Sequence, residues 1–157
     1  MTLKFMALPT DAVRALQMGE NDANGQRPIE AISDGGGNPC RHCLREIPAG
    51  ETMLVVGYRP FPEPQPYAEV GPLFVCSEPC QRHPESAELP EMFRSWEKIL
   101  IRGYTADNWI KYGTGQVISM AEVETAATKL FEQEDIAYIH MRSASNNCFQ
   151  ARIERGS

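Results

Sequence analysis

The chain has 157 residues, 42% of them hydrophobic and 23% charged, a balance typical of a soluble globular protein that predicts one domain over residues 1–157. Its net charge of −6, with basic residues scattered along the chain, argues against a nucleic-acid partner. No apolar run approaches the ~20 residues of a membrane helix and no signal peptide is visible, so we expect a cytoplasmic protein without membrane contact.

The first part of the chain predicts a strand and a short helix before a long polar loop. Residues 3–8, LKFMAL, have the composition of a strand. The helix that follows takes Thr10 as its N-cap and Gly19 as the residue just past its end. Residues 19–38 are polar and rich in glycine, which predicts an irregular loop.

The middle of the chain predicts strands on both sides of a proline-rich loop. Residues 52–58 and 71–76 are rich in β-branched and apolar residues, as strands are. Residues 59–67 hold four prolines, which remove backbone donors and fix φ, so this segment is an ordered loop. A short helix is expected after Pro90, and residues 97–105 predict another strand.

The last part of the chain predicts one helix and a hairpin. Residues 119–134 place apolar side chains at helical spacing, and Ser119 with Glu122 forms the pattern of a capping box. Residues 136–144 and 148–155 read as two antiparallel strands joined by a polar turn. Strands segregated from few short helices indicate an α+β fold with a largely antiparallel sheet.

Four of the five cysteines occur as two close pairs with metal-ligand spacing. Two residues separate the first pair, so both thiolates of a tight turn can face one ion. Three residues separate the second pair, and a hairpin formed by the intervening segment would return it to the first. The pattern predicts a zinc-finger-like cluster that holds structural zinc through Cys40, Cys43, Cys76 and Cys80.

Other interpretations of these cysteines stay open. His83 follows Cys80 by three residues and could replace one thiolate, whereas His42 is expected to point away or to hydrogen-bond a ligand. The four could also be ordinary reduced thiols. Cys40 and Cys43 have the spacing of a redox pair, but the flanking sequence lacks the helix that activates such thiols.

The order of knuckle, hairpin and ligand-bearing turn resembles a treble-clef zinc finger. The piece FVCSEPC is similar to the FCS-x-x-C element of the TRASH and MYM fingers, over about ten residues. Leu44 departs from that pattern, because a knuckle usually has glycine there. The interval between the two pairs is also longer than in those compact fingers.

Four longer stretches together resemble one family. PCRHCLREIPAGE, PYAEVGPLFVCSEPC, ILIRGY and CFQARIER look like the bacterial domain-of-unknown-function family numbered 1203. The resemblance spans nearly the whole chain. It implies a single-domain bacterial protein of about this length and brings no established activity with it.

A separate group of residues near the proline-rich loop suggests an enzyme as the alternative. Arg59 could bind an anion and Glu69 could act as an acid or base, although a solvated charge pair explains both. Cys148 could be a nucleophile with His140 as its base, although a packed cysteine and a packed histidine are the favoured interpretation. Converging arginines would make an anion pocket; the candidates are Arg59, Arg102 and Arg142.

The function that these observations favour is that of a small domain, stabilised by structural zinc, that binds a protein or a small-molecule ligand. The alternatives are an enzyme with an Arg59, Glu69 and Cys148 pocket, and a thiol-redox protein that uses Cys40 and Cys43. The partner and any substrate are not readable from the sequence.

Overall fold

The computed structural model describes residues 1–157, and the chain forms two compact units. One unit comprises Met1–Met6, Phe61–Ala68 and Pro84–Ser157, and the other comprises Ala7–Pro60 and Glu69–His83. Two α-helices, two antiparallel sheets and a close group of four cysteines confirm the predicted α+β class. That residues 1–157 fold as one domain stays a prediction.

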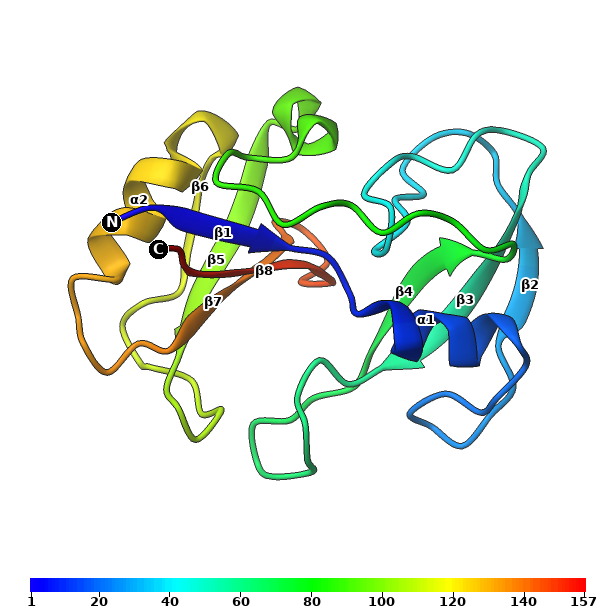
Figure 1. The fold of residues 1–157 in the computed structure, drawn as a ribbon, viewed down its shortest axis with the longest axis horizontal. Coiled ribbons are helices and arrows are strands. Elements are labelled where there is room, and N and C mark those ends of the chain that lie inside the picture. Colours follow the sequence, from blue (N-terminus) through cyan, green and yellow to red (C-terminus); the bar gives the residue numbers. More distant parts are fainter. The chain divides into compact units, whose positions relative to one another are not determined.

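The first unit is built on a five-stranded antiparallel sheet in the order β1-β8-β7-β5-β6 (Figure 1). Its strands are β1 (Leu3–Met6), β5 (Lys98–Tyr104), β6 (Gln116–Ser119), β7 (Tyr138–Ser143) and β8 (Phe149–Arg155). The helix α2 (Val123–Leu130) buries Val123, Ala127 and Leu130, and its contacts are with β5 and β1. The alternating buried residues of the strands, such as Ile99 and Ile101, complete this apolar core.

The second unit is built on a three-stranded antiparallel sheet in the order β2-β3-β4. Its strands are β2 (Ile29–Ile32), β3 (Thr52–Tyr58) and β4 (Gly71–Cys76), and the unit also contains the helix α1 (Thr10–Gln17). The interior of this unit includes Val13 and Leu16 of α1 and Val56 and Val75 of the sheet. The proline-rich segment between β3 and β4 forms no strand or helix, as predicted.

The predicted strands are confirmed, and the strand β2 was missed. β3, β4 and β5 match the predicted segments within two residues, and β7 and β8 pair as the predicted hairpin. The polar segment 19–38 contains β2, where only a loop was expected. Asp22 orders the preceding turn by accepting hydrogen bonds from the backbone N–H groups of Asn24, Gln26 and Gly57.

The predicted helix ends are partly wrong. The N-cap of α1 is Pro9, and the Thr10 side chain forms no cap hydrogen bond. Ser119 precedes a 3-10 turn, Met120–Glu122, and no side-chain hydrogen bond caps either that turn or α2. The expected capping box is therefore absent. A 3-10 helix, Glu91–Ser95, follows Pro90 where a short helix was expected. None of the helices has the length and apolar character needed to span a membrane.

Candidate metal centre

The first ligand segment is a tight knuckle that begins after Pro39. The backbone N–H of Cys40 donates to the Arg45 carbonyl at 3.0 Å, and the N–H of Leu44 donates to the Cys40 carbonyl at 3.0 Å. Leu44 has φ 52°, the left-handed conformation that glycine usually takes in such a turn. The Leu44 side chain is only 2% exposed, and its burial stabilises this strained backbone. The sequence had already shown leucine at a position where such a turn usually has glycine.

The second ligand segment begins at the end of β4 and is held next to the knuckle. Arg41 donates its backbone N–H to the Phe74 carbonyl at 3.1 Å, which joins the knuckle to β4. Helix α1 fixes the carbonyls of the segment, because Gln17 Nε2 donates to that of Cys76 at 2.9 Å and Arg14 donates to that of Cys80 at 2.7 Å. Hydrogen bonds from α1 side chains to their backbone carbonyls therefore position both cysteines.

The four predicted sulfurs come together in the second unit. The Sγ atoms of Cys40 and Cys80 lie 3.9 Å apart, those of Cys43 and Cys76 lie 4.0 Å apart, and all four lie within 4.8 Å of one another. All the cysteines of the chain are free thiols. Four thiolates around one tetrahedral zinc lie about 3.8 Å apart, as follows from Zn–S bonds of ~2.3 Å. The group could therefore hold a metal ion after a contraction of less than about one ångström.

A buried histidine supports one sulfur from outside the group. His42 Nδ1 lies 3.1 Å from Cys80 Sγ, and its Nε2 lies 2.9 Å from Thr10 Oγ1. The neutral ring carries one proton, so the consistent arrangement has the Thr10 hydroxyl donating to Nε2 and the Nδ1–H donating to sulfur. This confirms that His42 hydrogen-bonds a predicted ligand. Sequence reasoning missed the role of Thr10, which it had placed at the helix cap.

The ionisation of each sulfur in the group depends on its neighbours. Hydrogen bonds from Cys43 and Cys76 lower the pKa of the Cys40 thiol. The hydrogen bond to Cys40 raises the pKa of Cys76, while burial and then the Cys40 charge raise the pKa of Cys80. One thiolate thus forms at the expense of the others, and only a bound cation would let all four ionise together.

Two neighbours of the group have different roles. The Arg45 guanidinium lies beside Cys43, and their hydrogen bond raises the pKa of Arg45. No pattern in the sequence had singled out Arg45. His83 is not among the residues whose ligand atoms gather. Its backbone N–H donates to the His42 carbonyl at 2.8 Å, which helps to hold that loop.

The residues of the predicted enzyme site are distributed over both units. Arg59 and Glu69 belong to the second unit, whereas Cys148 belongs to the first. The Cys148 sulfur lies 3.8 Å from the Asn146 carbonyl oxygen. The Nδ1 atom of His140, the proposed base, accepts a hydrogen bond from Arg142 instead.

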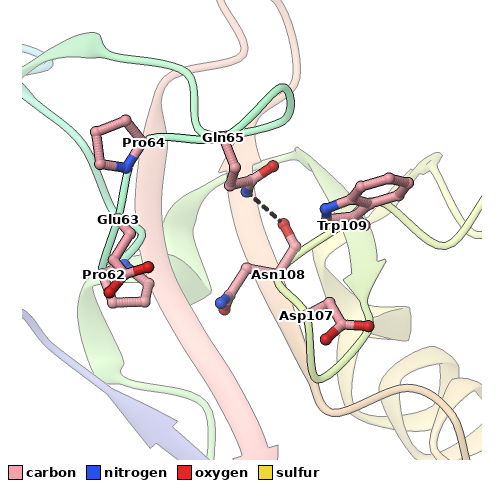
Figure 2. A pocket seen from close by; sticks show the side chains of 7 residues that line it. All are labelled: Pro62, Glu63, Pro64, Gln65, Asp107, Asn108 and Trp109. Atoms are coloured by element: carbon pink, nitrogen blue, oxygen red, sulfur yellow. Dashed lines mark hydrogen bonds between the residues drawn. The ribbon is translucent and has the colours of Figure 1, made fainter.

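A cavity of about 410 Å³ lies beside the proline-rich loop, in the first unit (Figure 2). Gln65 Nε2 donates to the Asn108 carbonyl at 2.9 Å across it. None of Arg59, Glu69 and Cys148 lines this cavity. The residues that do are Pro62, Glu63, Pro64, Gln65, Asp107, Asn108 and Trp109.

The fold and the cysteine group define a class: a small α+β protein with four close cysteines that could hold a metal ion. Residues 37–155 match the family described as "Protein of unknown function (DUF1203)", and the chain belongs to that family. The resemblance seen in the sequence is thereby confirmed. No curated protein and no solved structure matches the chain.

Proposed function

We propose that this protein is a cytoplasmic binding domain stabilised by structural zinc, with Cys40, Cys43, Cys76 and Cys80 as ligands. The observation that carries this is the gathering of four thiol sulfurs within 4.8 Å of one another. An all-sulfur tetrahedral donor set favours zinc. Cysteines stay as thiols in a reducing compartment, which suits thiolate ligands, and the family's bacterial character rests on the resemblance alone.

The ion would have a structural role. Four thiolates fill the tetrahedron and leave no position for a water or a substrate, as a catalytic zinc would require. The two ligand segments lie at the base of the β3–β4 hairpin, one in the knuckle and one at the end of β4. Zinc would therefore join the hairpin to the knuckle, and its binding energy would be folding energy.

Elemental analysis of the purified protein tests this proposal. We expect one zinc per chain, lost in Cys80→Ser and retained in Cys148→Ser, which is the matched control for removing one thiol. A chelator added with a reductant should lower the thermal midpoint, because metal binding stabilises the folded state alone. A metal-free wild-type protein whose unfolding ignores added zinc contradicts the proposal.

The two alternatives have weaker support. Thiol-redox chemistry at Cys40 and Cys43 lacks the activating helix, since the residues after Cys43 form no helix. An enzyme that uses Arg59, Glu69 and Cys148 draws no support from the cavity beside the proline-rich loop, which none of them lines. Fold-level analogy with other small zinc-stabilised modules supports the binding role. The class of its ligand is addressed next.

A further inference from the structure

One face of the five-stranded sheet carries a row of basic side chains next to aromatic rings. The register pairs Arg102 of β5 with His140 of β7, and His140 with Arg152 of β8. Side chains directly opposite each other on antiparallel strands share a face, with Cβ atoms about 4.5–5.5 Å apart. Arg142 lies two residues after His140 and so points to the same side. The opposite side of β7 carries apolar residues such as Ile139.

His140 lies at the centre of this row with an unused hydrogen-bond donor. Its side chain is 0% exposed, and its Nδ1 lies 3.2 Å from Arg142 Nη2. A guanidinium can only donate, so Nδ1 is the acceptor and the ring proton is on Nε2. This Nε2 has no hydrogen-bond partner. A buried donor without an acceptor costs about 1–3 kcal/mol, which makes it unusual in a native fold.

The surroundings of His140 are aromatic and positively charged. The rings of Tyr104 and Phe61 have centroids 4.6 and 5.2 Å from that of the imidazole. Burial lowers the pKa of His140 well below its usual range, and the charges of Arg142, Arg152 and Arg102 lower it further. The ring is therefore neutral at neutral pH. Glu154 of β8 accepts a hydrogen bond from Arg152 at 2.6 Å.

We propose that this face binds a small molecule through an oxyanion, a carboxylate or a phosphate group, which accepts the Nε2–H of His140. The guanidinium groups of Arg102 and Arg142 would supply the compensating charge, and such charge-assisted hydrogen bonds are the strong ones in proteins. This deepens the binding half of the proposed function by naming its ligand class. It does not depend on zinc, because all these residues belong to the other unit.

Entry of the anion requires one covering ring to move. Phe61 contacts both His140 and Tyr104, and it comes from the irregular segment between β3 and β4. A shift of this ring breaks no strand pairing, whereas the other neighbours, Tyr104, Tyr138 and Phe149, belong to strands. Phe61→Ala should therefore bind the anion at least as tightly as the wild type.

Nuclear magnetic resonance of the full chain, zinc-loaded and labelled with ¹⁵N-histidine, tests the inference. The chain has three histidines, so His140→Phe assigns the His140 signals. Inorganic phosphate and acetate are titrated separately, against chloride at equal ionic strength. We expect one of them to move the His140 Nε2 resonance in a saturable way, and which one does so tells phosphate from carboxylate ligands. If neither ion moves it, the inference is wrong.

Variants then locate the site. Arg102 is half-buried and so tolerant of replacement, and Arg102→Met should weaken binding about tenfold through the loss of one charge-assisted hydrogen bond. Arg94→Met is the control, because it removes one arginine charge at an exposed ion pair with Glu91. Equal losses in both variants would mean general charge screening and would overturn the inference. Zinc content is measured in the wild type and in both variants. One zinc per chain in all of them shows that a failure of anion binding is not a failure of the metal proposal.

Discussion

Replacement of His42 by phenylalanine tests how much the outer contacts of the cysteine group contribute to metal binding. His42 is fully buried, with Cys80 Sγ 3.1 Å from one ring nitrogen and Thr10 Oγ1 2.9 Å from the other. Phenylalanine keeps the volume of the ring and removes both hydrogen bonds. The four sulfurs themselves are unchanged in this variant.

The expected loss follows from the contact to sulfur. Hydrogen bonds to metal ligands are worth roughly 10–100-fold in metal affinity, which corresponds to about 1.4–2.8 kcal/mol. At saturating zinc the contribution of the metal to the free energy of unfolding falls by the same amount, because the ion binds only the folded state. The metal-free protein also loses the Thr10 hydrogen bond, worth about 1 kcal/mol. The difference between the metal-loaded and metal-free forms therefore isolates the effect on the metal.

Competition with a chromophoric chelator measures zinc affinity, and urea unfolding with and without zinc measures stability. His83→Phe is the matched control, because it removes a histidine near Cys80 that lies outside the group. We expect His42→Phe to weaken zinc binding and His83→Phe to leave it unchanged. Unchanged affinity in His42→Phe would refute the reasoning, and a larger loss in His83→Phe would identify His83 as a ligand.

Three further outcomes can be checked with simple assays. Leu44→Gly relieves a left-handed backbone that costs about 1–2 kcal/mol but deletes a buried side chain worth roughly 2–5 kcal/mol, so urea unfolding should show net destabilisation; a more stable variant would contradict this. Ser119→Ala should change the free energy of unfolding by less than about 0.5 kcal/mol, rather than the ~1 kcal/mol of a true N-cap, since no cap hydrogen bond exists; a loss of the larger size would restore the capping box. Titration with Ellman's reagent should find one thiol in the zinc-loaded protein, Cys148, because four of the five cysteines are in the group; all five should react after denaturation with chelator, and five before it would exclude a metal centre.

The strands that were predicted correctly are rich in the apolar and β-branched residues that are typical of buried strands. β3 and β5 carry runs of β-branched and apolar residues, and β7 and β8 are separated by a polar turn. β2 could not be predicted in this way, because its apolar residues Ile29 and Ile32 are 63% and 73% exposed. Its pairing with β3 is made by the backbone, which leaves no alternation in the sequence.

The cysteine group was predictable because chain spacing alone limits where two close pairs can lie. Its surroundings were not, since Thr10 and Arg45 approach the sulfurs through tertiary packing. The sequence named Arg102 and Arg142 as candidates for an anion pocket, but it did not place His140 between them on the larger sheet. Arg102, His140 and Arg152 are far apart in the sequence, and only the strand register places them in one row.

The closeness of the sulfurs has a consequence for oxidation. Cys40 with Cys80, and Cys43 with Cys76, are separated by 40 and 33 residues in the chain, yet their sulfurs lie 3.9 and 4.0 Å apart. If metal is stripped in air, these thiols can join as covalent cross-links across long loops. Each such loop would stabilise the fold by about 3–5 kcal/mol through the lost entropy of the unfolded chain. An oxidised, metal-free sample could thus unfold as late as the zinc-loaded protein, with a different bond holding the same two segments together.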